Sequence, residues 1–229
     1  MLHVRNVSFS YRKQLIFKDI TAQFPIGKII GIAGANGCGK STFIRLLTGM
    51  LQPDTGEILL YEDRLTRTSC KQFAYLPDID LFYADNTGEE VFTFYQSQFA
   101  DFSIEKARQA ADYLQVSTTA KLQKLSKGKR ALVKMAATLG RNVPYYIMDE
   151  PFSGLDPMVR ESLIRGLIQF IEPDTQTIIL STHEIYEVEP VLDALMVIKD
   201  QQIIAYETLE DIRDELQKDA VAWLKSQHQ

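Results

Sequence analysis

The chain has 229 residues, of which 45% are hydrophobic and 24% are charged. These are the proportions of a globular domain, so collagen-like, low-complexity and wholly disordered classes are excluded. The 25 Lys and Arg residues and 30 Asp and Glu residues give a formal net charge of −5, which does not favour a nucleic-acid-binding surface. We therefore expect a single domain over residues 1–229 without a nucleic acid partner.

The sequence predicts no membrane span and no disulfide framework. Its longest near-apolar stretch, residues 29–35, is far shorter than the roughly 20 residues that cross a bilayer. The first twelve residues lack the apolar core of a signal peptide. Two cysteines, Cys38 and Cys70, favour a reducing cytoplasm over a disulfide scaffold or metal cluster. Any link to a membrane is therefore expected to come through a partner.

The chain begins with strands around a glycine-rich turn. Val7, Phe9 and Tyr11 alternate with serines, as in a half-buried strand. Residues 28–33 predict a short buried strand that leads into the turn and then into a helix over about 41–50. Two further strands are expected over residues 57–62 and 72–77.

The middle of the chain predicts helices. Residues 81–125 show no strand-like alternation, Thr87 and Glu90 have capping-box spacing, and Ser103 is a second candidate cap. We therefore expect an inserted helical subdomain over about 79–140. Seven aromatics fall within 21 residues here; most are expected in its core and some in a docking groove for a partner helix. They are Phe82, Tyr83, Phe92, Phe94, Tyr95, Phe99 and Phe102.

The last third alternates strands and helices. Strands over 143–149 and 177–182 flank a helix that begins at Pro157, and residues 195–206 predict a hairpin. The whole order predicts an α/β fold with a mostly parallel sheet, an N-terminal antiparallel β portion and the helical subdomain. A final amphipathic helix is expected over about 208–226, carrying Leu209, Ile212, Leu216 and Trp223.

Residues 34–42 fit the phosphate-loop pattern G-x-x-x-x-G-K-[ST]. Glycines let the backbone curl so that its N–H groups face phosphate oxygens, and the next helix presents its N-terminus to the same anion. Lys40 is expected at the β- and γ-phosphates and the Ser41 hydroxyl on Mg²⁺. The alternative is a chance glycine-rich turn, which the strand–loop–helix context disfavours. The candidate nucleotide-binding residues are Gly34, Asn36, Gly37, Cys38, Gly39, Lys40, Ser41 and Thr42, with Cys38 a small residue that the loop tolerates.

An apolar strand ends in two adjacent carboxylates, Asp149 and Glu150. Strand ends of a parallel sheet share one rim, which here also carries the phosphate loop. Asp149 can hold Mg²⁺ directly or through water, and Glu150 can polarise a water against the γ-phosphate. A solvated strand end is the alternative for an isolated pair; the phosphate loop about a hundred residues earlier favours the catalytic interpretation.

An ordered set of short motifs resembles the ATP-binding cassette (ABC) ATPases over nearly the whole chain, most closely bacterial exporter-type cassettes. Residues 125–129 are similar to their signature loop and residues 153–156 to their D-loop. The resemblance implies a P-loop NTPase core that works as a head-to-tail dimer. Each ATP would lie on one subunit's phosphate loop and under the other subunit's Ser126, Lys127 and Gly128.

Several of these residues also have plainer interpretations. Ser126 is a reasonable helix cap without any phosphate. His183 resembles the family's switch histidine, which orients the attacking water, and alone it is a packed or surface histidine. Asp156 caps a helix and would reach across the dimer. Tyr11 stands where the family stacks an aromatic on adenine, and is otherwise a strand residue.

The chain departs from the family pattern at three positions. Lys127 and Lys129 replace the usual glycine and glutamine of the signature, and a lysine near the γ-phosphate adds attraction. Asp78 stands where a glutamine is expected; it keeps an acceptor for Mg²⁺, loses the amide donor and adds a charge that repels the γ-phosphate. We hypothesise that Asp78 is a Mg²⁺ ligand or binds a metal-bound water.

The resemblance implies the ATPase subunit of an ABC transporter, with ATP and Mg²⁺ as cofactors. Its partners would be a second nucleotide-binding subunit and separate membrane subunits docked on the helical subdomain, which places it in the cytoplasm at the inner face of the membrane. Two other classes remain open. One is a cassette ATPase of DNA repair, translation or cofactor assembly, disfavoured by the lack of a coiled-coil insertion or basic patch. The other is an ATP-sensing module with little turnover, suggested by Asp78 and the altered signature.

Overall fold

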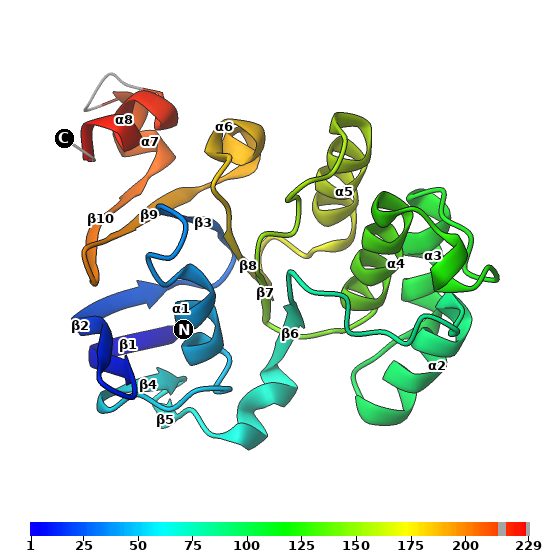
Figure 1. Ribbon diagram of the computed structural model, residues 1–229, viewed down its shortest axis with the longest axis horizontal. Helices are drawn as coiled ribbons and strands as arrows, with labels where there is room; N and C mark the ends of the chain where they lie inside the picture. The colour runs from blue at the N-terminus through cyan, green and yellow to red at the C-terminus, as the bar shows by residue number, and fades with distance from the viewer. Residues whose placement is uncertain (215–218, 228–229) are drawn as a thin grey trace.

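The computed structural model describes residues 1–214 and 219–227. A four-stranded antiparallel sheet and a six-stranded sheet lie beside a lobe of helices (Figure 1). The first sheet has the order β2-β1-β4-β5, formed by Gln14–Phe24, Leu2–Tyr11, Thr55–Leu60 and Asp63–Arg64. The second has the order β10-β9-β3-β8-β7-β6, formed by Gln202–Thr208, Ala194–Lys199, Ile29–Ala33, Thr177–Ser181, Tyr145–Met148 and Phe73–Leu76.

The six-stranded sheet is parallel except for β10, which confirms the predicted α/β fold. Strands β7 and β8 are buried along their whole length, as expected of parallel strands that are covered on both faces. Tyr145 and Ile147 pack with the antiparallel sheet on one face, and Tyr146 and Met148 pack with the helices on the other. The sheet thus separates two hydrophobic cores and fixes the rim where its strands end.

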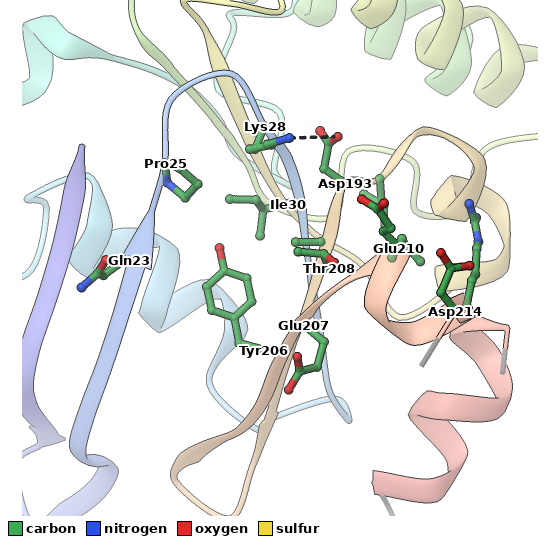
Figure 2. Close-up of a pocket in the computed structure, with 14 residues that line it drawn as sticks. Gln23, Pro25, Lys28, Ile30, Asp193, Tyr206, Glu207, Thr208, Glu210 and Asp214 are labelled. Carbon is green, nitrogen blue, oxygen red and sulfur yellow. Dashed lines mark ion pairs between the residues drawn. The ribbon is translucent and has the colours of Figure 1, made fainter. Parts of the chain in front are cut away.

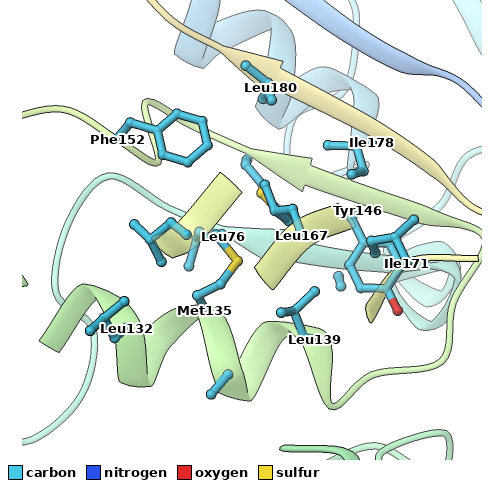
Figure 3. Close-up of a cluster of buried hydrophobic side chains, with 14 of the residues drawn as sticks. Leu76, Leu132, Met135, Leu139, Tyr146, Phe152, Leu167, Ile171, Ile178 and Leu180 are labelled. Atoms are coloured by element: carbon cyan, nitrogen blue, oxygen red, sulfur yellow. The ribbon is translucent and has the colours of Figure 1, made fainter. Parts of the chain in front are cut away.

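Helices cover the sheet and build the lobe. Leu132, Met135 and Leu139 of α4 point toward Ile178 and Leu180 of β8 across the core between the sheet and the helices (Figure 3). None of the helices in the described ranges is long and apolar enough to span a bilayer. The helices are α1 Lys40–Leu47, α2 Gly88–Gln98, α3 Ile104–Tyr113, α4 Lys127–Leu139, α5 Pro157–Phe170, α6 Ile185–Val188, α7 Leu209–Asp214 and α8 Ala220–Gln227, with 3-10 turns at Arg67–Gln72, Leu122–Lys124 and Glu189–Val191.

The predicted caps of the lobe helices are confirmed. Thr87 and Glu90 form the capping box of α2, with the Thr87 N–H donating to Glu90 Oε2 at 2.7 Å. The Lys106 N–H donates to Ser103 Oγ at 3.1 Å at the start of α3. Most of the lobe aromatics are core or pack against it, as predicted, whereas Tyr83 and Phe94 are exposed. The sequence predicts helix over residues 81–125. In the structure, α2 and α3 cover the middle of this segment, and its two ends are irregular.

The N-terminal sheet is larger than the sequence predicts. The expected strand over residues 7–11 is part of β1, and β2 was not predicted at all. The pairing register of β1 with β2 shifts from Val4 to Val7 and again after Val7. Asn6 in β1 and Asp19 in β2 both have positive φ angles of 49°. Such bulges break the period-2 alternation on which strand prediction depends.

The predicted C-terminal helix over 208–226 is divided into α7 and α8. Thr208 caps α7 by accepting from the Asp211 N–H at 3.0 Å, and Asp219 caps α8 by accepting from the Ala222 N–H at 2.6 Å. The second cap starts a new helix, which the apolar periodicity does not reveal. Leu209, Ile212 and Trp223 are buried, while Leu216 lies outside the described residues.

An ion pair between a buried arginine and a partly exposed aspartate joins the loops that follow α4 and α2. Arg141, which is 3% exposed, donates through Nε and Nη2 to the two carboxylate oxygens of Asp101 at 2.6 and 3.0 Å. Its guanidinium also lies 3.7 Å from the ring centroid of Phe99.

We predict that Asp101→Ala lowers the free energy of unfolding by about 3 kcal/mol, because it leaves the Arg141 guanidinium buried without its counter-charge. Urea unfolding followed by circular dichroism measures this. Arg165→Ala, which breaks an exposed pair with Glu161, is the control and should change stability by less than about 0.5 kcal/mol. Equal effects of the two substitutions would contradict the assignment.

Candidate nucleotide site

A glycine-rich loop joins the end of β3 to α1. Gly34 has φ 156°, and a Cβ atom there would lie 2.5 Å from Ile198 O, so only glycine fits beside β9. Gly39 precedes α1 with φ 110°, in the region that side chains disfavour. The tight loop brings the N-terminus of α1 to the carboxyl end of the sheet, where N–H groups and the helix dipole favour an anion.

Lys40, the first residue of α1, is folded over this loop. Its side chain is 6% exposed, and Nζ donates to Gly34 O at 2.9 Å. The same Nζ lies 3.4 Å from Glu150 Oε1. The ammonium therefore stands between the loop and the carboxylate, where it can meet a phosphate that enters between them.

Asp149 is brought to Ser41 as the sequence predicts. The Ser41 hydroxyl donates to Asp149 Oδ1 at 3.0 Å, and Asp149 is 3% exposed. A hydroxyl and a carboxylate are hard oxygen donors of the kind Mg²⁺ prefers, so these residues fit the ion. Residues 1–214 and 219–227 contain no group of three or more His, Cys, Asp or Glu placed to hold a metal. Mg²⁺ in nucleotide sites commonly takes its remaining ligands from phosphate oxygens and water.

Glu150 is held by groups on two other elements. His183 Nδ1 lies 2.8 Å from Glu150 Oε2 in a hydrogen bond, and Lys40 approaches the other carboxylate oxygen. The backbone of Glu150 is left-handed, with φ 46°, a conformation that a non-glycine residue adopts at some energetic cost. The structure thus brings Lys40, Glu150 and His183 together and directs the carboxylate by contacts on both of its oxygens.

Asp78 reaches the same rim without joining the Ser41–Asp149 pair. The Asp149 N–H donates to Leu76 O at 2.8 Å, so the chain leaves β6 beside the carboxylates. Asp78 lines a cavity of about 160 Å³ together with Glu150 and Lys127. Within the described chain, no hydrogen bond links Asp78 to Ser41 or Asp149, and its metal role stays a prediction.

Ser126 caps α4, so the structural part of its predicted role is confirmed. The Lys129 N–H donates to Ser126 Oγ at 3.3 Å, and Ser126 is exposed. A Cβ atom on Gly128 would lie 3.1 Å from Val159, so the first turns of α4 and α5 pack closely. Because Ser126 is exposed, the N-terminus of α4 is open toward solvent.

The D-loop, residues 153–156, lies against the signature loop of its own chain. Lys127 Nζ donates to Ser153 O at 3.2 Å, directly over Gly154, whose φ is 64°. Asp156 caps α5 by accepting from the Val159 N–H at 3.0 Å, as expected. The amine of Lys127 is thus engaged within its own subunit.

The site geometry agrees with the comparisons to known proteins. A protein-family model described as "ABC transporter" matches residues 17–153. The chain belongs to the ABC transporter ATP-binding family. It is 30% identical, over 92% of this chain and 79% of the other, to the uncharacterized ABC transporter ATP-binding protein MJ1023 of Methanocaldococcus jannaschii.

Solved cassettes share the fold. An ATP-binding subunit of an ABC transporter aligns over 100% of both chains with a TM-score of 0.87 and 27% identity. The cassette MJ0796, described as dimeric and bound to ADP and Pi, aligns over 91% of this chain and 99% of its own with a TM-score of 0.80 and 20% identity. The cassette therefore has the P-loop NTPase fold of the family, and its function is ATP binding and hydrolysis that drives transport.

Tyr11 lies at the end of β1, with its ring packed edge-on against Phe9 at 4.9 Å between centroids. The side chain is partly exposed, which leaves a ring face for a base. Stacking of Tyr11 on adenine stays a prediction.

A larger cavity of the cassette lies away from all of these residues. It measures about 600 Å³ and is lined by Gln23, Lys28, Asp193 and Tyr206 among others (Figure 2). Lys28 precedes β3, whereas the phosphate loop follows it, so the cavity is at the opposite end of that strand. The larger cavity is therefore separate from the candidate nucleotide site.

The sequence analysis missed Ser181 and Leu224. Ser181 Oγ donates to Asp149 Oδ1 at 2.8 Å and accepts from the Glu150 N–H at 2.9 Å. A polar residue at the end of the buried 177–182 strand was the available signal. Leu224 of α8 lines a cavity of about 280 Å³ with Asn36 and His183, a contact that no local pattern indicates.

We predict that Ser181→Ala lowers kcat for ATP hydrolysis by about tenfold, because it removes a hydrogen bond to a buried carboxylate and leaves the Glu150 N–H unpaired. Steady-state ATPase kinetics measure this. Ser162→Ala is the control, because the Ser162 hydroxyl donates to the Met158 carbonyl of its own helix. An unchanged kcat in Ser181→Ala would remove Ser181 from the site.

Proposed function

We propose that the cassette hydrolyses Mg²⁺-ATP at two composite sites of a head-to-tail dimer and transmits the closure to membrane subunits. The observation that carries this proposal is the arrangement of Glu150. Its two carboxylate oxygens contact Lys40 and His183, and it adjoins the part-buried Ser41–Asp149 pair. Lys40 supplies a cation that can bind phosphate, and Glu150 supplies a base that His183 orients. Ser41 and Asp149 supply two hard oxygen donors on the same rim.

Each residue has a definite task in this proposal. Lys40 and the loop N–H groups bind the β- and γ-phosphates. Ser41 and Asp149 would hold Mg²⁺, which would neutralise charge that develops on the phosphate oxygens. Glu150 accepts the proton of the water that attacks the γ-phosphorus, as the bond to the bridging oxygen of ADP breaks. His183 keeps the Glu150 carboxylate in place through Nδ1. Its Nε2, which lies 3.9 Å from Glu184 Oε1, is the atom that would face the γ-phosphate.

In the proposed dimer, the N-terminus of α4 in one subunit completes the phosphate site of the other subunit. Ser126 and the open N-terminus of α4 offer hydroxyl and N–H donors to an anion. No hydrogen bond in the described ranges joins them to the phosphate loop of the same chain. A second copy, turned head to tail, would bring Ser126 to the γ-phosphate and complete the site. Cassettes of this family act as dimers.

The docking of membrane subunits is supported by exposed apolar side chains on the lobe. Leu81 and Tyr83 are 63% and 80% exposed, beside a cavity of about 260 Å³ lined by Phe82 and Leu122. A short cytoplasmic helix of a membrane subunit fits such a surface through its apolar face. This docking would hold the cassette at the inner face of the cell membrane.

We predict that Glu150→Gln lowers kcat by at least about a hundredfold, because an amide does not accept the proton of the attacking water. ATP binding should persist, and the protein should accumulate as an ATP-dependent dimer. Phosphate release and light scattering with Mg²⁺-ATP measure the two effects. Glu161→Gln on the surface of α5 is the control. A variant that hydrolyses ATP at the normal rate would show that another group is the base.

We predict that Tyr83→Asp reduces co-purification with integral membrane partners by about tenfold, because it places a charge in an apolar contact. Basal ATPase of the purified cassette should stay within about twofold, since Tyr83 lies outside the nucleotide site. Ile168→Asp, at an exposed apolar residue of α5, is the matched control. Normal recovery of the membrane partner with Tyr83→Asp would move the docking surface elsewhere.

A further inference from the structure

Lys134 of α4 binds the backbone of the segment between β6 and the lobe. Lys134 Nζ donates to Pro77 O and to Ile79 O, each at 3.0 Å. It also lies 3.6 Å from Asp80 Oδ1, and its side chain is only 11% exposed. The two carbonyls that flank Asp78 are therefore held by one ammonium group.

A second cation of α4 supports the same contact. Arg130 Nε donates to Asp80 Oδ2 at 3.0 Å, and Nη1 donates to Leu125 O at 2.8 Å. Arg130 and Lys134 are four residues apart, so they lie on one face of the helix. Asp80 thus bridges two cations, and residues 77–80 are bound to the helix that begins at Ser126.

These residues separate two cavities. Asp80, Arg130 and Lys134 line both the 160 Å³ cavity that contains Asp78 and Glu150 and the 260 Å³ cavity beside the exposed lobe surface. The same side chains therefore face the nucleotide rim on one side and the lobe surface on the other.

The burial of Lys134 has an electrostatic cost that its neighbours offset. Burial lowers the pKa of Lys134, and the charges of Asp80 and Asp78 oppose this shift. Two carbonyl oxygens and a carboxylate replace the water that the ammonium loses. An apolar side chain at this position would leave those oxygens without their donor.

We propose that Lys134 is a positioning residue, which fixes residues 77–80 to α4 and thereby sets the place of Asp78 at the metal rim. This rests on the Mg²⁺ role proposed for Ser41, Asp149 and Asp78. If α4 moves when the dimer closes, this attachment would move Asp78 with it, so the Ser126 end of α4 and Asp78 would change position together.

Lys134→Met tests this assignment, because methionine keeps the length of the side chain and removes its donors. We expect the half-saturating Mg²⁺ concentration to rise and kcat to fall, each by about tenfold, with KM for ATP within about twofold. Amide hydrogen exchange of residues 78–81, measured without nucleotide or metal, should become faster. Lys134→Arg should recover most of the kcat and the Mg²⁺ dependence.

Lys106→Met, at a half-buried lysine of α3, is the matched control and should leave all of these measurements unchanged. If thermal melting shows that Lys134→Met does not fold, Lys134→Gln, which keeps an N–H donor group, is measured in the same way. Unchanged exchange at residues 78–81 would overturn the proposal. Faster exchange with normal kcat and Mg²⁺ dependence would also overturn it, since Lys134 would then be structural only.

Asp78→Gln separates this proposal from the metal role on which it rests. If Asp78→Gln leaves the Mg²⁺ dependence unchanged, Asp78 is not a metal ligand. Faster exchange and a lower kcat in Lys134→Met would then still support the attachment of residues 77–80 to α4. If Glu150→Gln hydrolyses ATP normally, the catalytic assignment fails without affecting the exchange result.

Discussion

The nucleotide site depends on the buried carboxylate of Asp149. Its Oδ1 accepts hydrogen bonds from Ser41 of α1 and Ser181 of β8, while its N–H donates to Leu76 O of β6. One residue at the end of β7 therefore ties together the phosphate loop and the two neighbouring strands. Because a buried carboxylate without partners is unfavourable by several kcal/mol, these elements are held in register at the rim. A Mg²⁺ ion at Ser41 and Asp149 would join oxygens that the fold has already brought together.

Backbone conformation supplies the second constraint. Gly34 has no room for a side chain beside β9, and Glu150 adopts a left-handed conformation directly after Asp149. The cost at Glu150 is offset by its N–H bond to Ser181 and by its carboxylate contacts with Lys40 and His183. Both turns line the candidate nucleotide site, where small displacements of a base or a cation change the rate most.

The parts of the fold that local patterns encode were predicted from the sequence. The phosphate loop, the buried strands and the caps at Thr87, Ser103 and Asp156 each depend on neighbouring residues. Strand β2 was missed because bulges hide its alternation. The role of Ser181 depends on the register between β7 and β8, and that of Lys134 on bonds to backbone carbonyls. Ser181 shows only as a polar residue at the end of a buried strand, and Lys134 leaves no pattern in the side chains.

Two of the departures from the family pattern, Asp78 and Lys127, belong to one balanced set of charges. The 160 Å³ cavity beside Glu150 is lined by the cations Lys127, Arg130 and Lys134 and by the anions Asp78, Asp80 and Glu150. A neutral glutamine in place of Asp78 would leave one cation in excess in this cavity. The carboxylate that would repel a γ-phosphate in isolation is therefore faced by ammonium groups of its own chain. Lysines in α4 and an aspartate after β6 compensate for each other, so replacing one of them alone disturbs the balance.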